Sequence, residues 1–473
     1  MPNLVIYDLE TSDSSLHFSQ ILECAMILVN DNLQELDRAV FHARLNKTFI
    51  PHPGALITNK ISIKRLKETN LSEYQMTKQL VDTLSKWGKN ISMGWNSTNF
   101  DRNIIRSTMF RNLEKTYILN SNGNSEADLI HVARSAHLFY PGSIKTGTTS
   151  KGNAEFKLTS ISAANDLKHE DKHTALSDCE ATLSTAKLLK EKAKSVWDSS
   201  MLTTSKQEVM KILENEQMVI VTENYGGGPR PHLVTYLCPH PKFTWPLCVD
   251  LRHDIDHLLT LNVHHLKEEL KGKPKPVRTI KHSAHPILMN PSYLNNFEPY
   301  NAIGMTKLLE RAKKIKMNKE FAEKVSLIKK EEVEEKEANN QVDKFVEETI
   351  YSGGFPVSKD QKVIEDFNQT DNWKDKYNLR NKFTDERYSY FAKRLIYENS
   401  PELLDQTEYK QISKFFADNF LSTEKKPFTT IPSAMQAIDD LRNKHEGNDE
   451  IISQLEEING YIEELQTMYE KAK

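Results

Sequence analysis

Apolar and polar positions in the first 196 residues alternate between stretches of strand length and stretches with helical spacing. Strands are predicted at 4–8, 21–29, 39–45 and 91–93, and helices at 74–86, 101–113, 127–137 and 175–192. The stretch 142–153 is rich in Gly, Ser, Thr and Lys, which indicates a loop. Three strands followed by alternating helix and strand predict a mixed α/β sheet covered by helices.

The pattern changes after about residue 196. Short strand-like pieces at 218–255 are interrupted by glycines and prolines, which is typical of a small twisted sheet or barrel. The stretch 305–345 is highly charged and helical, and helices and loops follow beyond 351. We therefore predict three domains, at 1–196, 197–350 and 351–473.

The last predicted helix carries an apolar stripe with 4-3-4-3-4 spacing. This stripe either packs within its own domain or binds a partner helix. Its members are Ile451, Leu455, Ile458, Ile462, Leu465 and Tyr469.

Composition limits the class of protein. A chain of 473 residues is too long for one ordinary core, and its 38% apolar and 27% charged residues are typical of a soluble globular protein. The sequence has no apolar run of the roughly 18–20 residues that span a bilayer and no basic leader, so we expect a cytoplasmic protein without membrane contact. Four cysteines without a CxxC pair suit a reducing compartment. Because the net charge is only −3, any surface that binds phosphates must be local.

Acidic residues gather at the ends of the predicted elements of the first domain. Asp8 and Glu10 lie two apart at the end of the first strand, so their side chains share one face. Asp101 begins a helix, and His173 and Asp178 lie at the start of the helix 175–192. Taken singly, each has an ordinary explanation as a polar strand end, a helix cap or a surface residue.

Together, these five residues suit the hydrolysis of phosphodiesters. That reaction uses two divalent cations about 3.5–4 Å apart, and Mg²⁺ prefers oxygen ligands that leave positions open for water and phosphate. A nearby histidine, whose pKa lies close to the working pH, can accept a proton from the attacking water.

Three short motifs resemble those of the DEDDh 3′→5′ exonucleases. They are Asp-Leu-Glu-Thr at 8–11, Asn-Phe-Asp at 99–101 and His-x4-Asp at 173–178. The resemblance implies that Asp8, Glu10, Asp101 and Asp178 bind the metal ions and that His173 is the general base. Further segments look like the bacterial exonuclease I family, among them 50–58, 111–112, 128–130, 156–158, 224–226, 240–241, 249–251 and 351–355.

The family resemblance implies an architecture and an activity. We expect an α/β RNase H-like exonuclease domain, a small domain containing an SH3-like β-barrel, and a C-terminal helical domain. The implied activity is processive 3′→5′ degradation of single-stranded DNA to 5′-mononucleotides, in DNA repair or recombination. It implies two Mg²⁺ ions, with Mn²⁺ able to substitute, a monomer, and binding to the acidic C-terminal tail of single-stranded-DNA-binding protein. Ser12–Ser15 stand where the family usually has an aromatic residue and a glycine.

A run of cations without acidic residues lies in the second domain. It either forms a solvated face or binds phosphates, and its position beside a nuclease domain favours phosphates. Its members are Lys271, Lys273, Lys275, Arg278 and Lys281, with His282 and His285. Three aromatic residues, Tyr225, Phe243 and Trp245, either stack on bases or belong to the barrel core.

We predict substrate contacts from a wider set of residues. The set is Leu9, Thr11, Thr58, Asn99, Arg134, Lys145, Lys157, Arg230, Lys273, Lys275 and Arg278. Two other functions stay open: a 3′→5′ exonuclease that trims RNA or proofreads, and a catalytically inactive scaffold that binds nucleic acid. The large second and third domains argue against the first, and the presence of all five site residues argues against the second.

Overall fold

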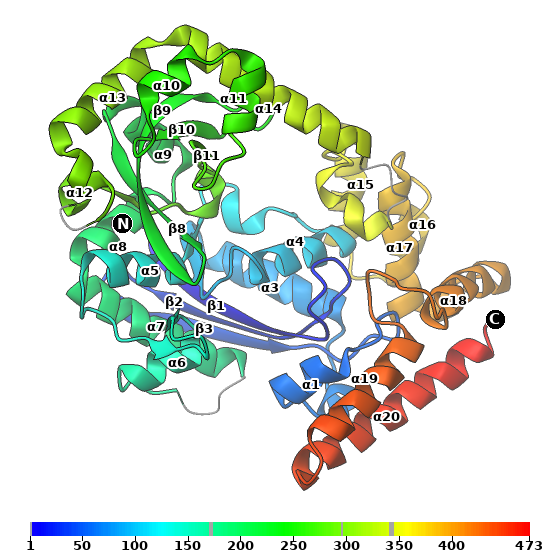
Figure 1. Ribbon diagram of the computed structural model, residues 1–473. Coiled ribbons are helices and arrows are strands. Elements are labelled where there is room, and N and C mark those ends of the chain that lie inside the picture. The colour runs from blue at the N-terminus through cyan, green and yellow to red at the C-terminus, as the bar shows by residue number, and fades with distance from the viewer. Residues whose placement is uncertain (1, 170–173, 295–296, 340–344) are drawn as a thin grey trace.

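A five-stranded sheet forms the centre of the N-terminal region in the computed structural model, which describes residues 2–169, 174–294, 297–339 and 345–473 (Figure 1). The strands are β1 (Asn3–Thr11), β2 (Ile21–Val29), β3 (Glu35–His42), β4 (Asn90–Gly94) and β5 (Ser125–Asp128), in the order β3-β2-β1-β4-β5. β1 pairs antiparallel with β2, and β2 with β3, whereas β4 runs parallel to β1 and β5 parallel to β4.

Helices cover both faces of this sheet. They are α1 (Pro53–Asn59), α2 (Ile63–Glu68), α3 (Glu73–Trp87), α4 (Asp101–Arg111), α5 (Leu129–Phe139), α6 (Leu158–Ala164) and α7 (Ala175–Lys192), with the short 3-10 helix η1 (Ile118–Asn120). Successive residues of β1 enter two different cores, with Leu4 and Ile6 on one face and Val5 and Tyr7 on the other. All nine residues of β2 are buried, as expected for a strand covered on both faces.

Most predicted elements of this region are present, and the differences have clear causes. The third strand begins at Glu35 rather than at 39, because it lies at the sheet edge, where charged side chains reach solvent. β5 was not predicted, because its sequence Ser-Glu-Ala-Asp carries little strand signal. The predicted loop at 142–153 contains a short strand, β6 (Gly147–Thr148), which pairs with β7 (Ala154–Glu155).

A second five-stranded sheet follows, with the order β11-β10-β9-β8-β12. Its strands are β8 (Val219–Tyr225), β9 (Gly228–Pro239), β10 (Pro246–Asp250), β11 (Val277–Thr279) and β12 (Leu288–Met289). The helices of this region are α8 (Lys194–Leu202), α9 (Lys206–Asn215), α10 (Ile255–Thr260), α11 (Val263–Glu269), η2 (His282–Ala284), η3 (Pro291–Leu294), α12 (Tyr300–Ile303), α13 (Met305–Met317) and α14 (Lys319–Asn339). Ile220 and Leu233 share a core with Leu4 and Ile6, so the second region packs directly on the first.

The remainder of the chain is helical. Its elements are η4 (Val346–Tyr351), α15 (Ser358–Gln369), α16 (Trp373–Leu379), α17 (Glu386–Asn399), η5 (Pro401–Leu403), α18 (Gln406–Phe420), α19 (Ile431–Lys444) and α20 (Asp449–Glu470). Figure 1 shows α1 of the first region beside α19 and α20, and these helices share a core with β2 through Leu22. Within the described residues, every helix is too short or too polar to cross a membrane.

The apolar stripe of the last helix packs inside the molecule. Leu455, Ile458, Ile462, Leu465 and Tyr469 are all buried. The stripe packs against helices of its own region, as one of the two predicted alternatives states, but its core extends beyond that region. The packed neighbours include residues of the N-terminal region, so this helix also holds the C-terminal region against the sheet.

Candidate active site

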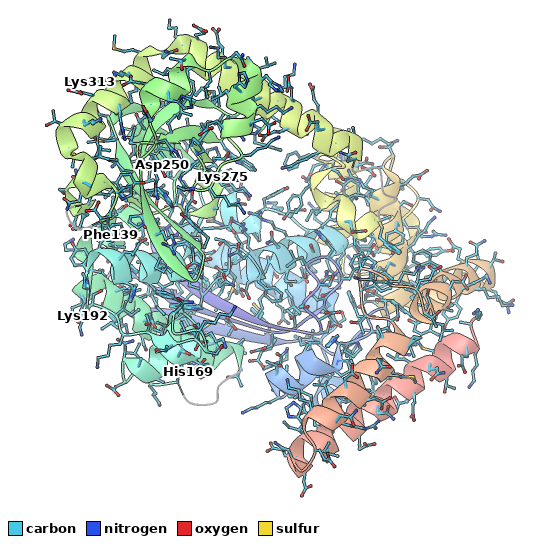
Figure 2. The ribbon with its side chains drawn as sticks, viewed as in Figure 1. Phe139, His169, Lys192, Asp250, Lys275 and Lys313 are labelled. Atoms are coloured by element: carbon cyan, nitrogen blue, oxygen red, sulfur yellow. The ribbon has the colours of Figure 1, made fainter. Side chains whose placement is uncertain are left out.

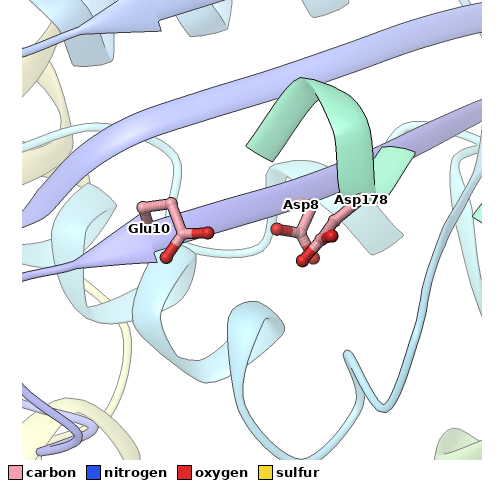
Figure 3. A group of neighbouring side chains, drawn as sticks. All are labelled: Asp8, Glu10 and Asp178. Atoms are coloured by element: carbon pink, nitrogen blue, oxygen red, sulfur yellow. The ribbon is translucent and has the colours of Figure 1, made fainter. Parts of the chain in front are cut away.

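Three carboxylates from two elements meet at one end of β1. Ligand oxygens of Asp8, Glu10 and Asp178 lie within 4.8 Å of one another (Figure 3). Asp8 and Glu10 share a face of β1, and Asp178 lies in the first turn of α7, which packs against β1. Asp101, the first residue of α4, is buried, and its charge acts on Asp8. The structure therefore brings three of the four predicted carboxylates together, and Asp101 lies close enough for its charge to act on Asp8.

Burial and mutual repulsion favour the neutral forms of these carboxyls. Burial raises the pKa of Asp8 well above its usual value, and the charges of Asp101 and Asp178 add to the effect. Burial, assisted first by the charge of Asp178, raises the pKa of Glu10 to about 8. Burial likewise raises the pKa of Asp101 to about 7. Such crowded carboxylates repel one another, and a divalent cation between them would remove that repulsion.

Asp128 shapes the loop that carries Asp101. Its carboxylate accepts hydrogen bonds from the backbone N–H groups of Asn96 (2.8 Å) and Thr98 (3.0 Å) and from the Thr98 hydroxyl (2.6 Å). Close approach of the loop to β1 requires Gly94, because a Cβ there would lie 2.7 Å from the Ser97 Cβ and 3.0 Å from the Tyr7 carbonyl oxygen. The loop conformation thus fixes where α4 begins.

Glu23 positions the start of α7. It lies opposite Glu10 on the neighbouring strand, and its carboxylate accepts a hydrogen bond from the Ala175 backbone N–H at 3.0 Å. Burial alone would raise the pKa of Glu23, but the hydrogen bond and charge of His42 and the charge of Arg65 outweigh burial and lower it. A negative charge at a helix N-terminus is favourable, so Glu23 stabilises the turn that carries Asp178.

A histidine that was not predicted contacts the site. The Nε2 of His169 lies 2.5 Å from Oδ1 of Asp178, and the His169 side chain is almost fully buried. Figure 2 labels His169 near α6. His173, the predicted general base, lies outside the described residues. The sequence contained one signal for His169, since it precedes Asp178 in the same segment as His173, but the His-x4-Asp spacing selects His173 alone.

The loop after β1 contacts the C-terminal region. The Thr429 hydroxyl donates a hydrogen bond to Oδ2 of Asp13 at 2.6 Å, and the Ser15 hydroxyl donates to the Pro427 carbonyl oxygen at 3.0 Å. The ring of Phe18 packs against Phe428, with centroids 5.0 Å apart. Asp13 and Ser15, which belong to the segment where the family usually has an aromatic residue and a glycine, therefore contact the C-terminal region.

An open groove lies between the first and second regions. It has a volume of about 1530 Å³, and its walls include Asn99, Arg102, Arg134, Tyr225 and Lys281. Asn99 precedes Asp101 by two residues, so the groove reaches the loop that carries a site carboxylate. Of the predicted substrate contacts, Asn99 and Arg134 lie on this groove.

The other predicted contacts differ in their access to a substrate. Five cations and one hydroxyl residue are exposed: Lys145, Lys157, Arg230, Lys273, Lys275 and Thr58. Leu9 and Thr11 are buried, Leu9 within a core and Thr11 with its hydroxyl donating to the Asp13 carbonyl oxygen at 2.8 Å. Only the backbone of these two residues can face a substrate.

Arg278 is not on the surface that its sequence neighbours suggested. Its side chain is 5% exposed, with Nε 3.0 Å from Oδ2 of Asp250 and Nη1 2.6 Å from Oε2 of Glu223. Figure 2 labels Asp250 inside the second region and Lys275 beside β11. Arg278 lies within β11 and is buried, as its neighbour Val277 is, whereas Lys273 and Lys275 precede the strand and are exposed. The predicted phosphate contact by Arg278 is therefore not supported by its position.

The three aromatic residues of the second region are not core residues. Tyr225 and Phe243 are exposed, and Trp245 is half-buried. Each ring has a cation near its face: Arg230 over Tyr225 at 5.5 Å, Lys242 over Phe243 at 5.5 Å and Lys281 over Trp245 at 5.2 Å. These rings are therefore accessible, as the stacking alternative requires.

Known proteins with similar sequences are exodeoxyribonucleases. The family model of the exonuclease I C-terminal domain matches residues 344–465. Exodeoxyribonuclease I of Buchnera aphidicola subsp. Acyrthosiphon pisum is 26% identical over 387 residues, which make up 78% of this chain and 91% of the relative. Exodeoxyribonuclease I of Haemophilus influenzae is 27% identical over 339 residues, 67% of this chain and 69% of the relative.

Solved structures of exonuclease I share the fold. E. coli exonuclease I in complex with a dA16 oligonucleotide has a TM-score of 0.81 at 21% identity, with 98% of this chain and 100% of that chain covered. Exonuclease I from Methylocaldum szegediense has a TM-score of 0.84 at 19% identity, with the same coverage. This likeness confirms the predicted fold class of an α/β RNase H-like exonuclease domain, a small domain containing an SH3-like β-barrel and a C-terminal helical domain.

The mixed sheet and its carboxylate site have the features predicted for an α/β RNase H-like exonuclease domain. The C-terminal family match and the related sequences indicate which group of exonucleases the chain resembles. They confirm the predicted resemblance to bacterial exonuclease I, and the related exodeoxyribonucleases support the predicted enzyme class.

Proposed function

We propose that this chain removes nucleotides from the 3′ end of single-stranded DNA by metal-dependent phosphodiester hydrolysis and releases 5′-mononucleotides. The observation that carries this proposal is the approach of Asp8, Glu10 and Asp178 to within 4.8 Å, with Asp101 beside them. The carboxylates are held by one strand and two helices rather than by loops, which suits a reaction that depends on positioning.

The donor set fits divalent cations. Among the described residues, the grouped ligand atoms are carboxylate oxygens, which Mg²⁺ and Mn²⁺ prefer. Burial and the charges of neighbouring carboxylates raise the pKa values of Asp8 and Glu10, and a bound cation would favour their ionised forms. Asp8, Glu10, Asp101 and Asp178 would hold two Mg²⁺ ions, with Mn²⁺ able to substitute. When bound, such ions assist the attack of water and neutralise charge on the leaving oxygen.

The chain's own residues supply the remaining steps. His173 accepts the proton of the attacking water. Glu23 and the hydrogen bond from His169 fix the orientation of Asp178. The loop at 96–100, shaped by Asp128, sets the position of Asp101.

Activity should depend completely on a divalent metal ion. Because the carboxylates repel one another and cannot polarise a phosphate by themselves, excess chelator should abolish release of mononucleotides from single-stranded DNA. Mg²⁺ or Mn²⁺ should restore it. Ca²⁺, which prefers longer and more numerous oxygen contacts, is the control that tests whether geometry matters beyond charge. Full turnover in excess chelator would contradict the metal mechanism.

Relatives support DNA as the substrate. E. coli exonuclease I has been solved with dA16 and dT13 oligonucleotides, and related sequences are exodeoxyribonucleases. We propose that the strand follows the groove that contains Asn99 and Arg134 and passes the exposed cations Arg230, Lys273 and Lys275. Lys145 and Lys157 extend this surface on the first domain. Contacts with several phosphates at once would support processive action.

Cleavage should proceed from the 3′ end. A strand labelled at its 5′ end should shorten progressively, and a 3′-terminal phosphate should block it, because the site must hold a terminal nucleotide beside the carboxylates. The matched comparison is an RNA strand of the same sequence, which should be degraded much more slowly. Immediate release of the 5′ label as a mononucleotide would contradict the direction. Equal degradation of RNA would favour the RNA-trimming alternative, and binding without cleavage would favour the scaffold.

The relatives also suggest a protein partner. A complex of single-stranded-DNA-binding protein with exonuclease I has been solved. We propose that this chain binds the acidic C-terminal tail of that protein, acts as a cytoplasmic monomer, and serves DNA repair or recombination.

A further inference from the structure

Exposed apolar side chains gather in the segment that follows η4. Tyr351 is 54% exposed, Phe355 is 78% exposed and Val357 is 60% exposed. Single exposed apolar residues are common, but three within seven residues form a patch, and such patches often mark binding sites. We call the rings of Tyr351 and Phe355 the 351–355 platform.

The backbone of this segment is held firmly while its rings are exposed. Nη2 of Arg387 donates hydrogen bonds to the carbonyl oxygens of Gly353 (2.7 Å) and Gly354 (3.3 Å), and Asp385 fixes the guanidinium through an ion pair of 2.7 Å. A Cβ at Gly353 would lie 1.6 Å from Nη1 of Arg387, and Gly354 has a φ of +73°. Glycine is therefore needed at 353 for the arginine contact and is favoured at 354 by the backbone.

The platform lies against α4, the helix that begins with Asp101. The Tyr351 hydroxyl donates a hydrogen bond to Oδ1 of Asn103 at 3.2 Å. The Phe355 ring lies 5.6 Å from the Tyr117 ring, and the guanidinium of Arg106 lies 5.1 Å from that same ring. At a rise of about 1.5 Å per residue, Asn103 and Arg106 lie about 3 Å and 7.5 Å along the helix axis from Asp101.

This combination matches what an unpaired nucleic-acid strand offers. Bases expose two flat faces, which stack on aromatic rings whatever their sequence, and a preordered ring loses little entropy when a base is bound. A duplex cannot present its base faces in this way.

We propose that Tyr351 and Phe355 form a base-stacking platform for the single strand just before it reaches the carboxylate site. This proposal rests on the proposed function, since it concerns the path of the same strand. The platform is contributed by the C-terminal region, whereas the carboxylates belong to the first region. The C-terminal region would therefore bind the substrate directly, in addition to packing against the sheet.

Affinity for an unstructured DNA strand, measured in chelator so that nothing is cut, tests this proposal. Because stacking contributes about 1–3 kcal/mol per base, Phe355→Ala should weaken binding roughly 5- to 150-fold. Phe355→Trp should retain binding, and Phe355→Leu, which is apolar but has no ring, should lose it as alanine does. The dependence of affinity on salt should not change, because no phosphate contact is removed. Tyr351→Ala should weaken binding in the same way.

Val357→Ala is the matched control, since Val357 is equally exposed but not aromatic, and it should bind DNA as the wild type does. Wild-type affinity in Phe355→Leu, or a flattened salt dependence in Phe355→Ala, would overturn the platform. Unchanged DNA affinity together with lost affinity for an acidic peptide would assign the patch to a protein partner instead. Failure of the wild type to cut DNA with Mg²⁺ would contradict the proposed function. This result is measured as cleavage and is therefore distinguishable from the affinity results, which test the platform.

Discussion

Replacing His173 with alanine should lower turnover by roughly 10²–10⁴-fold, because a positioned general base contributes about that much to the rate. Affinity for single-stranded DNA should remain close to that of the wild type, since the cations and rings that hold the strand lie elsewhere. The measurement is single-turnover cleavage of a labelled strand at saturating Mg²⁺, with affinity measured separately in chelator. Asp178→Asn, which removes a metal ligand, is the positive control for lost activity.

His169 offers a matched comparison within the same segment. Its imidazole lies 2.5 Å from Asp178, so we expect it to position this proposed metal ligand rather than the attacking water. Removing such a partner typically reduces metal affinity or activity by about 10–100-fold. His169→Ala should therefore raise the Mg²⁺ concentration needed for half-maximal activity, and excess Mg²⁺ should recover most of the turnover. His169→Gln, whose amide N–H can still donate to Asp178, should recover part of the metal affinity.

The response of turnover to Mg²⁺ should therefore distinguish His173→Ala from His169→Ala. Turnover in His173→Ala should stay low at any Mg²⁺ concentration, whereas turnover in His169→Ala should recover. The reverse pattern would make His169 the general base and His173 dispensable. Equal and complete recovery of both variants at high Mg²⁺ would mean that neither histidine accepts the proton.

The sequence was sufficient to predict the acidic site. Asp8 and Glu10 follow an apolar run of strand length, and their spacing of two residues places both carboxylates on one face whatever the rest of the fold does. The helix Ala175–Lys192 was predicted with its observed bounds, because its apolar positions are regular and Thr174 caps its first turn. These features depend on local chemistry, and local chemistry can be read from a single sequence.

Features that depend on contacts between distant segments were not predicted. The hydrogen bond from Thr429 to Asp13 joins residues 416 positions apart, and no local pattern marks it. The 351–355 segment was noted only as a resemblance, since the exposure of Phe355 depends on how Arg387 holds the backbone. His169 was missed because its role depends on the course of the chain between it and Asp178.

Arg278 shows that the burial of a charged side chain also depends on contacts between distant segments. Five cations in eleven residues suggested one basic surface, but the count of charges says nothing about which side chains point inward. Arg278 is buried in β11 beside the buried Val277, and Asp250 provides a buried negative charge on the neighbouring strand β10. The cationic run therefore contains both a structural arginine and exposed lysines.

Replacing Arg278 with methionine should destabilise the second region by about 1.5–3 kcal/mol, because it removes a charge-assisted hydrogen bond to a buried carboxylate that keeps Arg252 as its other arginine partner. The carboxylate concerned is that of Asp250, whose side chain is fully buried. Burial alone would raise the pKa of Asp250, but the hydrogen bond of His232 and the charges of Arg252 and Arg278 lower it instead. This depressed pKa stabilises the fold above about pH 4, the ordinary value for aspartate, and the stabilisation disappears as the pH falls toward the folded-state value. Arg278→Met should therefore unfold more readily at pH 7 and lose less stability on acidification.

The exposed lysines should behave in the opposite way. In the double variant Lys273→Ala and Lys275→Ala, hydrogen exchange in β8–β10 and the midpoint of urea unfolding should match the wild type. The slope of log affinity for single-stranded DNA against log salt should flatten by about 0.7 for each lysine that contacts a phosphate. Fewer nucleotides should then be removed per binding event. If Arg278→Met instead kept its stability and flattened the salt slope as the lysine variant does, its guanidinium would contact DNA and the ion pair with Asp250 would contribute little. The two variants therefore separate the cations that hold the fold from those that hold the strand.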